Sequence, residues 1–309
     1  MDASIVVCTY NRAGSLHDTL RALRALTVPQ DRRIEVIVVD NNSRDDTRAV
    51  VEGFAAEWPV LRYAFEPQQG LSHARNLGIS LAQGEIVLFT DDDVLPEADW
   101  LEVTLQGMQR FKAAACGGYI APIWETPPPA WLTERFYGFL AVRVDRTDDY
   151  VMTGSDQTPF GANMAFRRSV FDIVGRFDTN RGRKGAVLAS GEDGEMFERI
   201  RAHGLTIAFL GGSRVHHKVE AFRCTRRYFR RWRRHTSKNL AIAKGVPGTR
   251  RVLNVPLYLF PQLARALLRC GIGYAFLAAD EAMNRDVVLH HFLGTMQGLF
   301  QIRKVGPNT

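Results

Sequence analysis

Residues 85–93 are Glu85-Ile86-Val87-Leu88-Phe89-Thr90-Asp91-Asp92-Asp93, a short apolar run that ends in three carboxylates. A run of this length is typical of a strand that is buried on both faces of a sheet. Other candidate strands cover residues 5–8, 34–39 and 62–65. Apolar residues recur at helical spacing over residues 15–26, 45–58 and 72–83. Short strands that alternate with helices predict right-handed βαβ units, so the fold class is α/β with a mostly parallel sheet and flanking helices.

Beyond Phe111 the alternation of strand and helix signals weakens. Residues 124–131 include three consecutive prolines and are expected to form a surface loop, because proline neither continues a helix nor pairs inside a sheet. Residues 161–170 indicate a strand that leads into a helix, and residues 191–203 indicate a further helix.

The composition excludes several classes of protein. The chain has 309 residues, of which 46% are hydrophobic and 24% are charged, so it is not intrinsically disordered and can form a large core. Its four cysteines lie far apart without a CxxC pair, which argues against a zinc ribbon or a disulfide framework and suits a reducing cytoplasm. We expect no secretory signal, because residues 1–4 carry no basic n-region and the apolar run at residues 5–8 is too short. We expect no transmembrane helix, because no uncharged apolar stretch reaches roughly 18 residues.

The net charge of +7 is distributed unevenly along the chain. Residues 211–309 contain 18 Lys and Arg against 4 Asp and Glu, a net charge of +14. Residues 1–210 contain 22 Lys and Arg against 29 Asp and Glu, a net charge of −7. A strongly basic segment of this kind usually faces phosphate groups, in nucleic acid or at a membrane surface.

Polar clusters follow three of the predicted strands, namely Thr9-Tyr10-Asn11-Arg12, Asp40-Asn41-Asn42-Ser43 and Asp91-Asp92-Asp93. Ligands of open parallel sheets bind beyond the carboxyl ends of the strands, so we expect the three clusters to converge at one site. The structural alternative is that they are turns that cap the helices that follow.

The three adjacent carboxylates at residues 91–93 repel one another, and a hard cation such as Mn²⁺ or Mg²⁺ would relieve that repulsion. Alternation along a strand predicts that Asp91 and Asp93 point together while Asp92 points away. The alternative is that they form an acidic N-cap for a helix over residues 96–109. No GxGxxG follows the first strand and no GxxxxGK[ST] occurs, which argues against dinucleotide dehydrogenases and P-loop NTPases. Arg75, early in a predicted helix, is a candidate for contacting a phosphate or a base.

In order and spacing, these motifs resemble those of family-2 glycosyltransferases, which are inverting enzymes of the GT-A fold. The resemblance covers about residues 3–240 and extends through Ala74-Arg75-Asn76-x-Gly78, Gly161-Ala162-Asn163-Met164-Ala165-Phe166-Arg167-Arg168, Gly175-Arg176-Phe177-Asp178 and Gly191-Glu192-Asp193. It implies a GT-A domain over residues 1–220, with a nucleotide-binding half at about 1–110 and an acceptor half at about 111–220. Residues 221–309 would be a basic, amphipathic helical extension.

The resemblance also implies an activity. The enzyme would be a metal-dependent hexosyltransferase that moves a sugar from a nucleotide-sugar, most simply a UDP-sugar, to a glycan or lipid-linked acceptor in cell-surface polysaccharide synthesis. The residues implied to hold the nucleotide are Thr9, Tyr10, Arg12, Asp40, Arg75, Asp91 and Asp92. The residues implied to hold Mn²⁺ or Mg²⁺ are Asp93, Asp91 and His217, with Asp91-x-Asp93 as the DxD motif.

Asp193 matches the general base of the family, which takes the proton of the attacking acceptor hydroxyl. Glu192 is the second candidate, and the alternative is that both are favourable charges at a helix N-terminus.

His216-His217 would equally suit a turn without a ligand. Trp124 and Trp131 flank the proline loop, where they either stack on an acceptor sugar or anchor the loop in the core.

Seven arginines lie within residues 223–234, interleaved with aromatic residues, and three apolar patches follow before residue 300. Taken alone, the arginines suit an RNA-binding arm or a solvated helix face. Basic residues beside apolar helices favour residues 223–300 lying on an anionic membrane, so we expect a cytoplasmic protein peripheral on the inner leaflet and no nucleic-acid partner. Packing of the same helices in a homodimer is the alternative.

Two other functions compete with this interpretation. A sugar-1-phosphate nucleotidyltransferase shares an α/β core but needs a glycine- and Lys/Arg-rich loop after its first strand, of which Ala13-Gly14-Ser15 is the only trace. A non-catalytic RNA-binding or membrane-scaffold protein would leave the acidic motifs at residues 91–93 and 192–193 unexplained.

Overall fold

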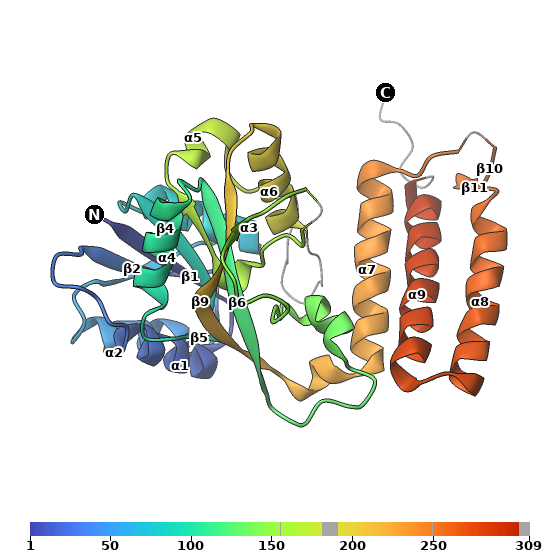
Figure 1. Ribbon diagram of the computed structural model, residues 1–309, viewed down its shortest axis with the longest axis horizontal. Coiled ribbons are helices and arrows are strands. Elements are labelled where there is room, and N and C mark those ends of the chain that lie inside the picture. The colour runs from blue at the N-terminus through green and yellow to red at the C-terminus, as the bar shows by residue number, and fades with distance from the viewer. Residues whose placement is uncertain (155, 181–190, 249, 303–309) are drawn as a thin grey trace. The chain divides into compact units, whose positions relative to one another are not determined.

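A computed structural model describes residues 1–154, 156–180, 191–248 and 250–302 (Figure 1). By its internal contacts the chain divides into two units. Unit 1 comprises Met1–Ile123 and Ala141–Lys218, and unit 2 comprises Trp124–Leu140 and the chain from Val219 onward. The loop that contains the proline triplet is therefore grouped with the C-terminal helices. The expected division of functions at residue 220 stays a prediction.

Unit 1 is built on a mixed sheet with the strand order β3-β2-β1-β4-β8-β6-β9-β5 over the described residues, and β7 pairs with β9. The first four strands are parallel, as the sequence predicts, and are β1 (Ala3–Thr9), β2 (Ile34–Asp40), β3 (Leu61–Phe65) and β4 (Ile86–Asp91). The pairings of the later strands are antiparallel. These strands are β5 (Val94–Pro96), β6 (Ala115–Trp124), β7 (Tyr150–Val151), β8 (Met164–Arg167) and β9 (Ile207–Val219).

Helices cover both faces of this sheet because β1, β2 and β4 bury apolar side chains on both sides. Ile5 and Val7 of β1 pack on one face with Leu16 and Leu20, whereas Val6 packs on the other. The first face carries α1 (Ala13–Arg24), α2 (Thr47–Ala55) and α4 (Trp100–Arg110). The second carries α3 (Leu71–Leu81), α5 (Val170–Val174) and α6 (Glu192–Ala202). The α/β class is confirmed.

Two boundaries differ from the sequence expectations. Residues 94–96 form β5, which pairs with β9, so the helix expected from residue 96 begins at Trp100. The strand that carries the histidine pair is 13 residues long rather than short, because its earlier half pairs with β7 and its later half with β5.

Unit 2 consists mainly of three helices, α7 (Arg226–Lys244), α8 (Leu259–Phe276) and α9 (Ala279–Ile302). Shorter elements are the 3₁₀ helices η1 (Glu134–Leu140) and η3 (Ala221–Cys224) and the strands β10 (Arg251–Val252) and β11 (Val255–Pro256). α9 approaches α7 closely, because a Cβ on Gly294 or Gly298 would overlap the backbone carbonyl oxygen of Arg234 or Lys238. Across the described ranges, none of the helices combines the length and apolar character that crossing a bilayer requires.

Two side-chain clusters hold unit 2 together. One is aromatic and joins the proline loop to α7: the ring of Phe229 lies 5.1 Å from Trp131 and 5.9 Å from Phe136, measured between centroids. The other is polar and joins the three helices. Buried Asp286 of α9 accepts hydrogen bonds from Arg230 of α7 at 2.7 Å and from the Tyr274 hydroxyl of α8.

Candidate active site

The polar clusters predicted from the strand ends do converge at one edge of the sheet. In the register of the parallel strands, Thr9 of β1 lies opposite Asp40 of β2, and Cys8 lies opposite Asp91 of β4. All of these positions are at the carboxyl ends of their strands, which is where open α/β sheets bind ligands. The convergence expected from the sequence is therefore confirmed.

Arg12 and two carboxylates of the triplet form the first part of the site. The Arg12 guanidinium is ion-paired with Asp93 and lies 3.4 Å from Asp92 Oδ1, and the Thr9 hydroxyl donates to Asp92 Oδ2 at 2.7 Å. Asp92 and Asp93 both lie against Arg12 Nη1, so the prediction that Asp92 points away is wrong, and the prediction that Asp91 points with Asp93 stays a prediction. Strand β4 ends at Asp91 and a turn follows, so strand alternation does not extend to the next two residues.

This group has donors that suit a hard divalent cation. Burial and the neighbouring Asp93 carboxylate raise the pKa of Asp92 to about 7, so negative charge is costly here. His217, on β9, places Nε2 3.4 Å from Asp93 Oδ1, and its role as a cation or phosphate contact stays a prediction. Among the described residues, no group of three or more His, Cys, Asp or Glu side chains is arranged to hold a metal ion by itself. A cation would therefore depend on oxygens of its ligand as well, which is the usual way in which Mg²⁺ and Mn²⁺ bind beside diphosphates.

Asp40 and Tyr10 lie at the same edge but differ in exposure. Asp40 is buried, and its two oxygens accept hydrogen bonds from the Ser43 amide and the Tyr63 hydroxyl, each at 2.8 Å. Tyr10 is exposed at the end of β1. An exposed ring can stack on a nucleobase, and a carboxylate held by two hydrogen bonds is a fixed acceptor.

The second part of the site is a triad of buried Arg75, buried Glu192 and partly exposed Asp193. Arg75 Nη1, from α3, lies 2.5 Å from Asp193 Oδ1 and 3.2 Å from Glu192 Oε1 at the start of α6. The backbone amide of Gly161 donates to Asp193 Oδ2 at 2.9 Å. The sequence placed Arg75 on the nucleotide and did not anticipate that it also pairs with the candidate bases.

The electrostatics of this triad suit proton transfer. Burial raises the pKa of Asp193 to about 6, although the guanidinium of Arg75 opposes that rise. Burial alone would lower the pKa of Arg75, but the carboxylates of Asp193 and Glu192 raise it above its usual value. The side chain of Asp193 is 20% exposed and that of Glu192 is 6% exposed, so Asp193 is the carboxylate that a ligand can reach.

Three further residues support this triad in ways that the motifs did not predict. Gly161 must lack a side chain, because a Cβ there would overlap the Arg75 guanidinium. Phe177 lies beneath that guanidinium, with 5.3 Å from Arg75 Cζ to the ring centroid. The Asn76 side chain donates to the Phe177 carbonyl at 2.9 Å and accepts from its amide at 3.0 Å. Asn76 and Phe177 thus bring two motifs into contact, those at residues 74–78 and 175–178. The spacing of motifs along the chain does not show which of them meet in the fold.

Trp124 and Trp131 belong to unit 2. Trp131 is buried against Phe136 and Phe229, which favours the anchoring role among the two alternatives. Trp124 is half-buried at the end of β6 and packs on Tyr137, with 5.6 Å between ring centroids. A role for either ring in acceptor binding stays a prediction.

Comparison with known proteins agrees with this geometry. Residues 4–175 match the family described as "Glycosyl transferase family 2". The chain is 32% identical over 258 residues to the "Succinoglycan biosynthesis protein ExoM" of Rhizobium meliloti, an alignment that covers 82% of this chain and 79% of that protein. It is 28% identical over 227 residues to the "Glucosyl-dolichyl phosphate glucuronosyltransferase" of Haloferax volcanii, covering 72% of this chain and 71% of that protein.

Among solved structures, the mannosyltransferase PcManGT from Pyrobaculum calidifontis, in complex with GDP-Man and Mn²⁺, shares the fold with a TM-score of 0.61 and 21% identity. The alignment covers 97% of this chain and 87% of that one.

Proposed function

The chain belongs to glycosyl transferase family 2 and is a glycosyltransferase, and from this premise we propose that it is a metal-dependent inverting enzyme. It would transfer a hexose from a nucleotide-sugar, with UDP as the first nucleotide to test, to a glycan or lipid-linked acceptor of polysaccharide or glycoconjugate synthesis. The single observation that carries the proposal is the Arg75–Asp193 pair, which holds a reachable carboxylate of raised pKa.

The proposed transfer is a single displacement. The acceptor hydroxyl oxygen forms a bond to the anomeric carbon while the bond from that carbon to the nucleoside diphosphate breaks, and Asp193 takes the hydroxyl proton. The Arg75 guanidinium and the Gly161 amide each contact one oxygen of this carboxylate, which holds its orientation. A base with a pKa near 6 is largely ionised at neutral pH yet more basic than an exposed carboxylate.

The donor would occupy the edge formed by β1, β2 and β4. We assign the nucleoside to Thr9, Tyr10, Arg12, Asp40 and Arg75, and place Asp91 and Asp92 near the ribose and the cation. Asp93, Asp91 and His217 would hold the cation, which when bound supplies positive charge to the departing diphosphate. The solved mannosyltransferase contains GDP-Man and Mn²⁺, so GDP is the second nucleotide to test.

Unit 2 would serve the acceptor side. The Haloferax relative, by its name, acts on a dolichyl phosphate-linked glucose, which is a lipid-linked acceptor. The arginines of α7 and the exposed apolar residues of α8 suit an anionic membrane surface where such an acceptor is available. We therefore propose docking through residues 223–300, with a homodimer through the same helices as the alternative.

The test is the Asp193→Asn variant, which keeps the shape of the side chain and removes the base. Isothermal calorimetry with UDP and with GDP, each with and without Mn²⁺, identifies the nucleotide first. We expect the variant to lose transfer by at least about 100-fold while binding that nucleotide as the wild type does. Glu192→Gln is the matched control and should retain most of the activity. Equal losses in the two variants would overturn the assignment, as would an Asp193→Asn variant that no longer binds the nucleotide.

A further inference from the structure

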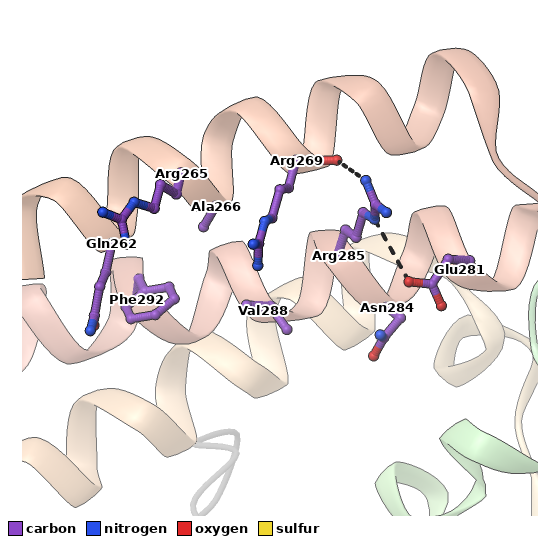
Figure 2. Close-up of a pocket in the computed structure, with 9 residues that line it drawn as sticks. All are labelled: Gln262, Arg265, Ala266, Arg269, Glu281, Asn284, Arg285, Val288 and Phe292. Carbon is purple, nitrogen blue, oxygen red and sulfur yellow. Dashed lines mark hydrogen bonds and ion pairs between the residues drawn. The ribbon is translucent and has the colours of Figure 1, made fainter.

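A groove of about 460 Å³ lies between α8 and α9 of unit 2. Figure 2 shows the residues that line it: Arg265 and Arg269 extend from α8, and Arg285 extends from α9. The lining is completed by Gln262, Ala266, Glu281, Asn284, Val288 and Phe292. The groove therefore combines three guanidinium groups and two amides with an apolar floor, and none of these residues belongs to the donor site described above.

The positive charge of the groove is compensated only in part. Glu281 is its one acidic lining residue: its Oε1 lies 3.7 Å from Arg285 Nε (Figure 2), and its Oε2 is ion-paired outside the groove with Arg135 at 2.7 Å. Arg285 donates to the Arg269 carbonyl at 3.2 Å, which fixes its position on the rim (Figure 2). Arg265 and Arg269 are exposed, and within the described part of the chain neither guanidinium meets a carboxylate. A ligand with about two negative charges would complement this set.

Exposed apolar residues continue from the groove along α8. Leu268, Ile272 and Phe276 follow Arg265 at intervals of three or four residues, which places all four on one stripe of the helix. Leu268 is 66% exposed and Phe276 is 82% exposed, although both are large apolar side chains. A stripe with an arginine at one end and exposed apolar side chains along the rest suits the boundary between lipid headgroups and acyl chains.

We propose that this groove binds the terminal phosphate group of a membrane lipid, with the chains of that lipid lying along the Leu268–Phe276 stripe. A terminal phosphate carries between one and two negative charges and exposes three oxygens, so two or three guanidinium groups can each donate paired hydrogen bonds to it. A phosphodiester headgroup carries one charge and exposes two such oxygens. The inference rests on the membrane docking proposed above, and it adds a site with a preferred headgroup to that general attraction.

The experiment measures binding of the full chain to vesicles without any donor present. Vesicles of phosphatidic acid supply a terminal phosphate, and vesicles of phosphatidylglycerol, matched in surface charge, supply a phosphodiester. The test variant is Arg265→Gln with Arg269→Gln. The control is Arg227→Gln with Arg231→Gln, which removes the same charge, at the same spacing, from exposed positions of α7.

We expect the wild type to prefer phosphatidic acid. The groove variant should lose this preference and bind phosphatidic acid about 30-fold more weakly, because each arginine near an anionic surface contributes about fivefold. The α7 variant should bind both lipids more weakly and keep the preference. A groove variant that retains the preference, or an α7 variant that loses it, would overturn the proposal.

Two further measurements distinguish this proposal from a site for free phosphate and from a failure of the transfer mechanism. Inorganic phosphate at the same phosphate concentration should not displace the protein from the vesicles; if it does, the site is one for free phosphate rather than lipid. The Asp193→Asn variant should show the wild-type lipid preference, because the base takes no part in docking. Failure of the lipid site and failure of the transfer mechanism are thus observed in different variants.

Discussion

Replacing Gly161 by alanine tests the triad through its geometry rather than by removing a charge. The added Cβ would overlap Arg75 Nη2 and lie 3.1 Å from Asp193 Oδ2. Arg75 is buried and cannot move to solvent, so the guanidinium must shift by about 1 Å or more to reach ordinary van der Waals separation. A misplacement of about 1 Å near the reacting atoms costs about 100-fold in rate. We therefore expect kcat to fall by about 100-fold, and the Kd for the nucleotide to rise as well, because the same guanidinium is assigned to the nucleoside.

The matched control for this variant is Gly194→Ala, in α6 directly after Asp193. A Cβ on Gly194 meets no atom within 4 Å, and alanine in a helix is favoured over glycine by about 0.5–1 kcal/mol. This control should be active and slightly more stable. The measurements are initial rates of transfer, nucleotide calorimetry and thermal unfolding of both variants. A Gly161→Ala variant that folds and transfers sugar at the wild-type rate would refute the claim that the Arg75–Asp193 geometry limits catalysis.

Three other predictions concern pH, metal and stability. Because burial raises the pKa of Asp193 to about 6 and the ionised form is the active one, kcat should fall tenfold per unit below about pH 6, and a rate that is flat down to pH 4.5 would exclude this base. Asp93→Ala should weaken Mn²⁺-dependent nucleotide binding at least about tenfold in calorimetry, whereas an unchanged Mn²⁺ dependence would place the cation elsewhere. Asp286→Ala removes the shared acceptor of Arg230 and Tyr274 and should lower the free energy of unfolding by about 3 kcal/mol in urea titrations. The control Asp280→Asn should have a free energy of unfolding within about 0.5 kcal/mol of the wild type.

The sequence was sufficient to predict the parallel half of the sheet. Residues 3–9, 34–40 and 86–91 are apolar on both faces and alternate with helices, and such strands have few other ways to be buried. It was not sufficient for the antiparallel half. Strand β6 contains Gly117, Gly118 and Pro122, which are poor strand formers, and it is a strand because it pairs with β8 and runs beside β9.

The candidate site was also predictable only in part. The strand-end clusters were correctly predicted to meet, and Thr9, Asp40 and Asp91 do lie at one edge of the sheet. The contacts of Arg75 could not be obtained in this way, since its partner carboxylates lie more than a hundred residues later in the sequence. The orientation within the acidic triplet was also beyond a periodicity argument, because it depends on where β4 stops and the turn begins.

The aromatic cluster of unit 2 has a consequence for synthesis of the chain on the ribosome. Trp131 and Phe136 are made roughly 90 residues before Phe229, the ring on which both of them pack. At a synthesis rate of 5–20 residues per second, Phe229 is added about 5–20 s after these two rings. During that interval the nascent chain exposes an aromatic surface that chaperones or aggregation with other chains would cover. A polypeptide that ends before α7 would present that patch permanently, so shortened forms of this enzyme should require coexpressed chaperones to remain dispersed.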